Sequence, residues 1–323
     1  MFKPLIMAVA LANCVAVAMP AHAEIKNLEI IAPANTGGGY DQHARALQQV
    51  LQDLNLASGV QVVNIPGAGG TIGLSQFVTG RKRNPSLMIG GLGMIGAILI
   101  NKSPVSLDQV APLALLTGEY QPLVVAADSP IRTLDDLIQK FKADPGSVTW
   151  GGFAVGSPDH ILSGLVIKAV GGDISRMNYI ASGAGGELMA ALLGNHITVG
   201  TGGYNEFASQ FEAGKLRAIG ISAPERLPGI DIPTFREQGV DVEFVNWRAV
   251  FAKTDLKPAE KKQLDSTIAS AISSPEWKDI ARQRGWIDLY QPSEQFAGFL
   301  TAERTRIEST LRELGLVETS SAQ

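Results

Sequence analysis

The stretch Ala-Pro-Ala-Asn-Thr-Gly-Gly-Gly-Tyr-Asp-Gln-His-Ala-Arg, residues 32–45, decides how this chain folds. An apolar run that ends at Ile31 predicts a strand before it, and apolar residues at helical spacing follow it over residues 44–54. Three glycines between a strand and a helix leave the backbone open to a ligand, and the helix start offers unpaired N–H groups and a partial positive charge. The stretch therefore predicts an anion site that needs no lysine or arginine, and a carboxylate fits it.

A second glycine-rich turn, residues 65–73, leads from a predicted strand into a predicted helix over residues 71–78. The order of strand, glycine turn and helix begins again after the break at residues 128–130. This alternation predicts an α/β fold with parallel sheets, and the length and the restart favour two domains. Apolar runs over residues 113–116 and 123–127 have the pattern of buried parallel strands. The C-terminal part predicts three helical segments, each opened by proline: residues 258–272, 275–284 and 292–316.

The N-terminal segment and the cysteine content predict a chain that is exported from the cytoplasm. The 323 residues are 45% hydrophobic and 18% charged, and the net charge of -4 gives no electrostatic reason to expect nucleic acid as a partner. Residues 1–23 combine a positive start, an apolar stretch and Ala-His-Ala before a cleavage point, which predicts a cleaved signal peptide and periplasmic protein. A membrane anchor is the alternative, but the apolar stretch is short and broken by Asn13 and Pro20. The only cysteine, Cys14, lies in this segment, so we expect neither disulfides nor thiol catalysis.

Motifs of cofactor binding are absent or weak. The chain has no G-x-x-x-x-G-K-[ST] phosphate loop and no G-x-S-x-G nucleophile turn. Residues 91–96 fit G-x-G-x-x-G after a predicted strand, but the acidic residue that would bind a ribose is poorly placed, since Glu119 lies past the next strand. Close packing of a helix on a strand explains these glycines equally well, so we expect no cofactor.

Residue types of a hydrolytic triad occur together at one helix start. Ser157, Asp159 and His160 lie within four positions, and side chains so close in sequence point in different directions. They fit a helix cap better, in which Ser157 or Asp159 accepts an N–H group. The spacing of His43, His160 and His196 is not that of metal ligands. We therefore expect no catalytic residue and no metal site.

Asp, Tyr and His side chains at the predicted helix starts each allow two interpretations. Asp41 is stabilised by the helix dipole, or it fixes the turn so that N–H groups point at a ligand. Tyr40 and Tyr204 can each donate a hydroxyl to a ligand or simply pack, and His160 can contact a ligand or belong to the cap. The sequence leaves these alternatives open.

Taken together, several stretches resemble the substrate-binding proteins of the tripartite tricarboxylate transporters, the Bug family. They are residues 32–39 with Asp41, Ala44 and Arg45; residues 66–73; residues 183–186 with 190–194; residues 214–218, 226–229, 233–234 and 237–239; and residues 246–248 with Phe251. The resemblance covers nearly all of the chain after residue 23.

The resemblance implies a two-lobed periplasmic binding protein of type II, with a ligand cleft between the lobes. One domain comprises residues 24–126 with 250–323, and the other comprises residues 127–249. By position, the two crossings between them are expected near residues 123–128 and 247–251. We expect a monomer that receives a small carboxylate and passes it to integral-membrane transporter subunits.

The resemblance also implies a set of binding residues from the turns of both lobes. In the first lobe they are Thr36, Gly37, Gly38, Tyr40, Asp41, Gly69, Gly70 and Thr71. In the second lobe they are Ser157, Asp159, His160, Ser182, Gly183, Gly202 and Tyr204. The expected ligand is citrate or a related di- or tricarboxylate. The alternatives are a C4-dicarboxylate or aromatic carboxylate, presentation of the ligand to a sensory receptor, or an exported enzyme that acts on a carboxylate.

Overall fold

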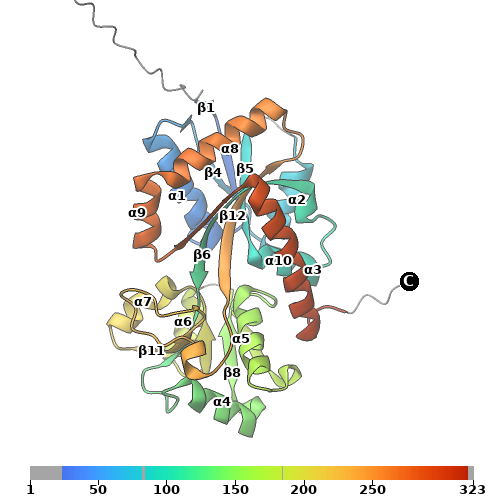
Figure 1. The fold of residues 1–323 in the computed structure, drawn as a ribbon. Coiled ribbons are helices and arrows are strands. Elements are labelled where there is room, and N and C mark those ends of the chain that lie inside the picture. Colours follow the sequence, from blue (N-terminus) through green and yellow to red (C-terminus); the bar gives the residue numbers. More distant parts are fainter. Residues whose placement is uncertain (1–23, 82–83, 184, 319–323) are drawn as a thin grey trace, which may run out of the picture.

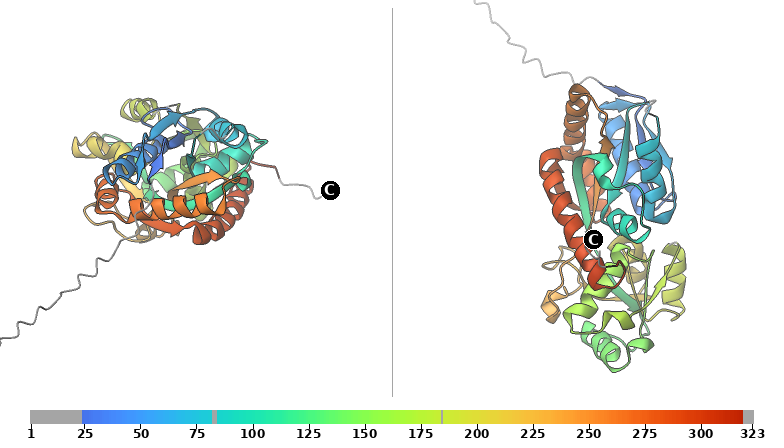
Figure 2. Two further views of the ribbon diagram at one scale, coloured as in Figure 1. Left: turned by 90° about the horizontal axis from the view of Figure 1, so that it is seen from above. Right: turned by 90° about the vertical axis from the view of Figure 1, so that its right-hand side faces the viewer.

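The strands of this computed structural model form two main sheets, one in each of two lobes stacked end to end (Figure 1; Figure 2). The structure describes residues 24–81, 84–183 and 185–318, so the predicted signal peptide lies outside the described residues. Helices cover the faces of both sheets, and the α/β fold predicted from the sequence is confirmed (Figure 1).

The first lobe is built on a six-stranded sheet. Its spatial order is β13 (Ile287–Pro292), β6 (Val110–Tyr120), β12 (Val245–Lys253), β5 (Ser86–Gly91), β2 (Glu29–Ala32) and β4 (Gln61–Asn64). Its helices are α1 (Gly39–Asp53), α2 (Thr71–Thr79), α3 (Leu92–Ile100), α8 (Pro258–Ser273), α9 (Pro275–Gln283) and α10 (Ser293–Glu313). A separate small sheet pairs β1 (Ile25–Lys26) with β3 (Ala57–Ser58).

The second lobe is built on a five-stranded sheet. Its spatial order is β11 (Leu216–Ile221), β7 (Pro122–Ala126), β10 (Val199–Thr201), β8 (Thr149–Gly152) and β9 (Asn178–Ala181). Its α-helices are α4 (Leu134–Ala143), α5 (Pro158–Ala169), α6 (Gly185–Leu193) and α7 (Tyr204–Glu212). Short 3₁₀ turns complete the chain: η1 (Ala68–Gly70), η2 (Leu107–Gln109), η3 (Pro145–Ser147), η4 (Ile174–Arg176) and η5 (Arg236–Gln238).

Helix α1 forms where the apolar spacing predicts it. Ala44, Leu47, Val50 and Leu51 are fully buried and pack in one core with residues of β2 and β5. Each buried Leu or Val stabilises the fold by about 1.5–3 kcal/mol. This apolar face fixes the helix on the sheet and so fixes where its N-terminus points.

The two central apolar runs form buried strands, but the prediction that these strands are parallel is wrong. Strand β6 is antiparallel to β12 and β13, and β7 is antiparallel to β10 and β11. The chain passes from β6 straight into β7 with no crossover helix between them. Because helices cover both faces of each sheet, an antiparallel strand here is as apolar as a parallel one, and hydropathy does not distinguish the two.

The chain crosses between the lobes at Gln121, between β6 and β7, and again just before Val245, which pairs with Tyr120. Both positions lie a few residues before those expected from the sequence. Residues 123–126 already pair within the second sheet, and residues 247–251 within the first. The reason is that each crossing is a continuous extended segment, with no turn residues to mark it. The predicted domain limits otherwise stay a prediction.

The three C-terminal helices return to the first lobe, but α10 also reaches the second (Figure 2). Near its end, Leu314 packs on Gly164 of α5, where a Cβ would lie 2.3 Å from Leu314 Cδ2. Lys168 of α5 forms an ion pair with Glu313. Strand β13, which the sequence did not reveal, precedes α10 at the sheet edge.

Candidate functional site

Several helix N-termini meet at the boundary between the lobes. A Cβ placed on Gly93 of α3 would lie 3.2 Å from Cδ of Pro158, at the start of α5, and 3.7 Å from the hydroxyl of Tyr40, in α1. A Cβ placed on Gly203, before α7, would lie 2.7 Å from Oε2 of Glu119, at the end of β6. The fold therefore brings candidate residues of the first turn close to those of the second lobe.

Four helices that start near this boundary, α1, α2, α3 and α7, have no side-chain cap, whereas the neighbouring α5 is capped by Ser157. Gly38, Gly91 and Gly203 are the N-caps of α1, α3 and α7, and α2 likewise begins after a glycine. Away from the boundary, α4 and α9 are capped by the hydroxyls of Thr133 and Ser274. Glycine caps leave the positive end of a helix dipole open to an anion, whereas a hydroxyl cap occupies it.

Asp41 holds the first glycine turn in place. Its buried carboxylate accepts hydrogen bonds from Gly37 N (2.8 Å), Asn64 Nδ2 (2.8 Å) and Arg45 Nε (2.9 Å). Burial pushes the pKa of Asp41 upward, but the hydrogen bonds from Arg45, Gly37 and Asn64 outweigh it and hold the pKa below its ordinary value. The interpretation that this side chain fixes the turn therefore has direct support.

Several N–H groups expected to face a ligand have internal partners instead. Gly37 N donates to Asp41, Gly38 N to Asn35 O and Gly70 N to Gly67 O. Thr71 N donates to the carbonyl of Ala68, and so does the Thr71 hydroxyl (3.0 Å). The first bond within α1 at this end is from Gln42 N to Gly38 O, so the N–H groups of Gly39, Tyr40 and Asp41 have no carbonyl one turn earlier.

The second glycine turn is fixed by its backbone conformation and by α3. Gly69 and Gly70 have φ of 64° and 98°, in the left-handed region that favours glycine. A Cβ on Gly69 would lie 2.5 Å from that of Ala97 in α3, so a side chain has no room there. Thr36, in the first turn, is exposed and donates its hydroxyl to Asn64 Oδ1 at 3.4 Å.

Arg248 stands between these helix starts, although sequence reasoning did not assign it to the site. Its guanidinium lies 5.2 Å from the ring centre of Tyr40, and its Nη2 lies 3.0 Å from where a Cβ on Gly39 would be. Its Nη1 donates to Asn246 Oδ1 and to the carbonyl of Trp247, while its buried Nε has no partner among the described residues. The one sequence feature that could have pointed to Arg248 as a site residue was its place in the Asn-Trp-Arg stretch, residues 246–248.

Ser157 is the N-cap of α5, as the sequence predicts, and Asp159 is buried behind it. The Ser157 hydroxyl accepts from His160 N at 3.5 Å. Asp159 accepts hydrogen bonds from Phe153 N (2.9 Å), Gln121 Nε2 (2.5 Å) and the Ser157 hydroxyl (3.3 Å). Burial raises the pKa of Asp159 to about 6, against the lowering effect of these donors.

His160 is a buried, neutral side chain of the second lobe. Its ring stacks on Tyr179 at 4.0 Å, and its Nδ1 accepts a hydrogen bond from Gly156 N (3.2 Å). Burial lowers the pKa of His160 to about 4. His43 is a core residue: its ring stacks on Trp286 at 3.6 Å and its Nε2 lies 2.8 Å from the Thr117 hydroxyl.

Desolvation raises the pKa values of three carboxyl groups around the boundary, those of Glu119, Asp159 and Glu206, and the charge of Arg248 acts in the opposite direction on all three. Glu119 and Glu206 come from opposite lobes, yet both lie near one point, 2.7 Å and 3.5 Å from a Cβ placed on Gly203. Glu206 is exposed, but protein flanks it, and this desolvation and the charges of Asp159 and Glu119 raise its pKa to about 8. Burial also raises the pKa of Glu119. Carboxyl groups with raised pKa values can take up protons when an anion enters.

The remaining candidates of the second lobe have structural partners. Ser182 N donates to Gly152 O, and Gly183 N donates to the carboxylate of Glu187 (2.7 Å). A Cβ on Gly202 would lie 3.2 Å from Glu206 Oε2, so this glycine packs beside the carboxyl group of Glu206. The ring of Tyr204 packs in an apolar cluster, 5.8 Å from that of Phe211 (centroid to centroid).

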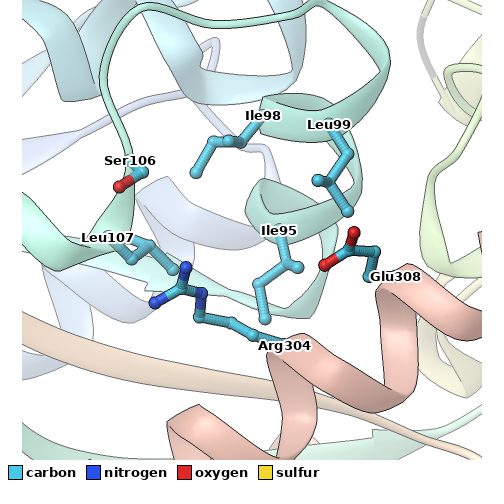
Figure 3. Close-up of a pocket in the computed structure, with 7 residues that line it drawn as sticks. All are labelled: Ile95, Ile98, Leu99, Ser106, Leu107, Arg304 and Glu308. Atoms are coloured by element: carbon cyan, nitrogen blue, oxygen red, sulfur yellow. The ribbon is translucent and has the colours of Figure 1, made fainter. Parts of the chain in front are cut away.

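Two cavities lie outside the group of glycine-capped helix starts. One of about 50 Å³ lies between α3 and α10, where Arg304 and Glu308 face the apolar side chains of Ile95 and Leu99 (Figure 3). It contains none of the candidate residues. Another, of about 430 Å³, is bordered by His160 and Tyr179 and by the end of α10, and His160 is its only candidate residue.

The glycines of the dinucleotide-like motif serve close packing. A Cβ on Gly91 would lie 2.4 Å from Trp247 O, and one on Gly96 would lie 2.3 Å from Gly156 O. Across the described part of the chain, no three side chains of His, Cys, Asp or Glu gather as metal ligands would. Within residues 24–81, 84–183 and 185–318, no helix has the length and apolarity that a bilayer crossing requires.

Comparison with known proteins agrees with this geometry. Residues 43–316 match the model of the tripartite tricarboxylate transporter family receptor. Protein BugT of Bordetella pertussis is 29% identical over 297 residues, which is 89% of each chain. An R. palustris protein solved with adipate superposes with a TM-score of 0.81 at 20% identity, covering 90% of this chain and 97% of that one. MatC of Rhodopseudomonas palustris, solved with malate, gives a TM-score of 0.75 at 21% identity, with 89% and 99% covered.

The family match spans most of the chain, and the structural matches show the fold of two-lobed periplasmic binding proteins. Members of this family are substrate-binding receptors and not enzymes. The chain therefore belongs to the tripartite tricarboxylate transporter receptor family, as a periplasmic solute-binding protein.

Proposed function

We propose that this protein captures a di- or tricarboxylate of the citrate type between its lobes and delivers it to a tripartite tricarboxylate-type membrane transporter. The observation that carries the proposal is the group of uncapped helix starts around Arg248. Two of these helices are α1 and α3, and Arg248 lies close to Gly39 at the start of α1 and to Gly91 before α3. Open helix dipoles and a guanidinium are complementary to a carboxylate.

The carboxyl groups of Glu119 and Glu206 near Gly203 favour the proposal that the ligand has more than one carboxyl group. Glu206 has a pKa raised to about 8, so at neutral pH it can be a neutral donor to a second carboxylate. Its protonation would remove the repulsion that a polyanion meets at an ionised carboxylate. Solved relatives with malate and adipate carry ligands with two carboxyl groups, which fits this arrangement.

A thermal-shift screen of residues 24–323 tests the ligand class. Citrate, isocitrate, malate, succinate, adipate and an aromatic acid are each added in excess. Ligand at about a hundred times its dissociation constant adds about 2.7 kcal/mol of stability. We expect a shift with di- or tricarboxylates, whereas a shift with the aromatic acid alone would move the assignment to that class.

Arg248→Gln tests the site itself. Loss of a charged hydrogen bond to the ligand costs about 1.5–3 kcal/mol, so affinity should fall about 10- to 100-fold. The matched control is Arg236→Gln, an exposed arginine paired with Asp241 and Glu243 on the second lobe. Equal affinity of both variants would remove Arg248 from the site. Uptake of the labelled acid by cells with and without this protein then tests delivery.

A further inference from the structure

Both crossings between the lobes are held by one buried residue of the second lobe, Ser222, through its hydroxyl and its backbone. At the first crossing, Gln121 N donates to the Ser222 hydroxyl (2.9 Å), and Ser222 N donates to Gln121 O (3.1 Å). At the second crossing, the Ser222 hydroxyl donates to Phe244 O (2.6 Å), and Phe244 N donates to Ser222 O (3.0 Å). Ser222 is fully buried, so water does not compete for these bonds.

The residues one step towards the first lobe are held by a different sheet. Tyr120 and Val245 pair with each other at the ends of β6 and β12. Gln121 and Phe244, their chain neighbours, are held by Ser222 at the end of β11. Each crossing therefore passes from the hydrogen bonds of one sheet to those of the other within a single residue step.

Gln121 is tied to the second lobe by its side chain as well. Its Nε2 donates to Asp159 Oδ1, and Asp159 also accepts from Phe153 N in the turn before α5. The end of α10 touches the second lobe too, where Leu314 packs on Gly164. That apolar contact can slide, because dispersion contacts have no fixed direction. The neighbouring ion pair of Lys168 with Glu313 joins two half-exposed side chains, which hold each other weakly. Four buried hydrogen bonds through one residue fix geometry instead.

We propose that Ser222 is the pivot of this protein: its hydroxyl locks both crossings to the second lobe and confines rotation of the lobes to the steps Tyr120–Gln121 and Phe244–Val245. With the hydroxyl present, the two steps act as one axis. Without it, each crossing can bend over several residues, and the lobes can rotate and slide in additional directions. This inference concerns the ligand-free chain and does not depend on which solute is bound.

The experiment measures the distribution of distances between the lobes by double electron–electron resonance, without ligand. Cys14 is the only cysteine and precedes Glu24, so a chain expressed from Glu24 takes labels only at introduced cysteines. Asp53→Cys at the end of α1 and Lys142→Cys near the end of α4 place labels at exposed positions of the two lobes. Ser222→Ala is compared with Ser163→Ala, which removes another fully buried serine hydroxyl, one that bonds only within α5.

We expect Ser222→Ala to broaden the distance distribution and Ser163→Ala to leave it as in the parent. Equal widths in all three proteins, or equal broadening in both variants, would overturn the proposal. Hydrogen exchange of the unsubstituted protein gives a second test if Ser222→Ala does not fold. The amides of Gln121, Ser222 and Phe244 should exchange as slowly as that of Val124 in the centre of β7, and fast exchange at Gln121 or Phe244 would overturn the pivot.

Discussion

Asp41→Ala should both destabilise the protein and weaken ligand binding. The carboxylate accepts from Gly37 N and Asn64 Nδ2, each at 2.8 Å, and from Arg45 Nε at 2.9 Å. A hydrogen bond to a charged group contributes about 1.5–3 kcal/mol, but Gly37 is exposed and water can replace part of its bond. Arg45 is 46% exposed, so its ion pair adds about 1 kcal/mol or less. We expect a total loss of about 2–4 kcal/mol.

The assay is urea unfolding at neutral pH, followed by calorimetric titration with the acid that gives the largest thermal shift. Freed from Asp41, the turn must reorder when a ligand binds, which should lower affinity about tenfold. The control is Asp136→Ala, because this carboxylate also accepts N–H groups, those of Arg132 and Thr133, but lies exposed at the start of α4. Asp136→Ala should leave affinity unchanged.

The pH dependence of the same variant gives a further check. The folded pKa of Asp41 lies below its ordinary value of 3.8, so its stabilisation is present above that pH and is lost as the pH falls through the folded pKa. Parent and Asp41→Ala should therefore converge in stability in strong acid. A loss below about 0.5 kcal/mol at neutral pH, or the same affinity as the parent, would refute the role given to this residue.

Three other predictions concern the boundary. The pKa of Glu206 is raised to about 8, so its ionisation should lower stability as the pH rises from about 4.5 to 8, and Glu206→Gln should flatten this part of a melting-temperature profile. An unchanged slope would show that Glu206 titrates normally. The pKa of His160 is lowered to about 4, so the stability that it gives as a neutral acceptor for Gly156 N should fall as the pH drops from 6.5 to 4. His160→Phe should remove this pH dependence of stability. At neutral pH the variant should lose about 1–3 kcal/mol of unfolding free energy in urea. Gly69→Ala would place its Cβ 2.5 Å from that of Ala97 at a φ of 64°, so it should lower the free energy of unfolding by more than about 1 kcal/mol and reduce ligand affinity. A variant with the stability and the calorimetric affinity of the parent would contradict this.

Local rules were enough for the helices and their starts. The apolar spacing of α1 and the proline-led C-terminal segments appear in the structure close to their predicted bounds. Ser157 caps its helix as expected, because a hydroxyl at a helix start satisfies N–H groups within the same turn. These features depend on residues within one or two helical turns, so the sequence alone determined them.

The sequence did not reveal the direction of the central strands, the exact crossings or the composition of the site. Arg248 reaches the helix starts only because β12 lies beside β5, and Glu119 meets Glu206 only because two lobes approach there. Several N–H groups of the glycine turns are used by Asp41 and by neighbouring carbonyls, which glycine content does not show. The sequence by itself determined a two-lobed α/β chain with open, glycine-capped helix starts. Tertiary structure decided which charges and which free donors meet there, because those distances join residues far apart in the chain.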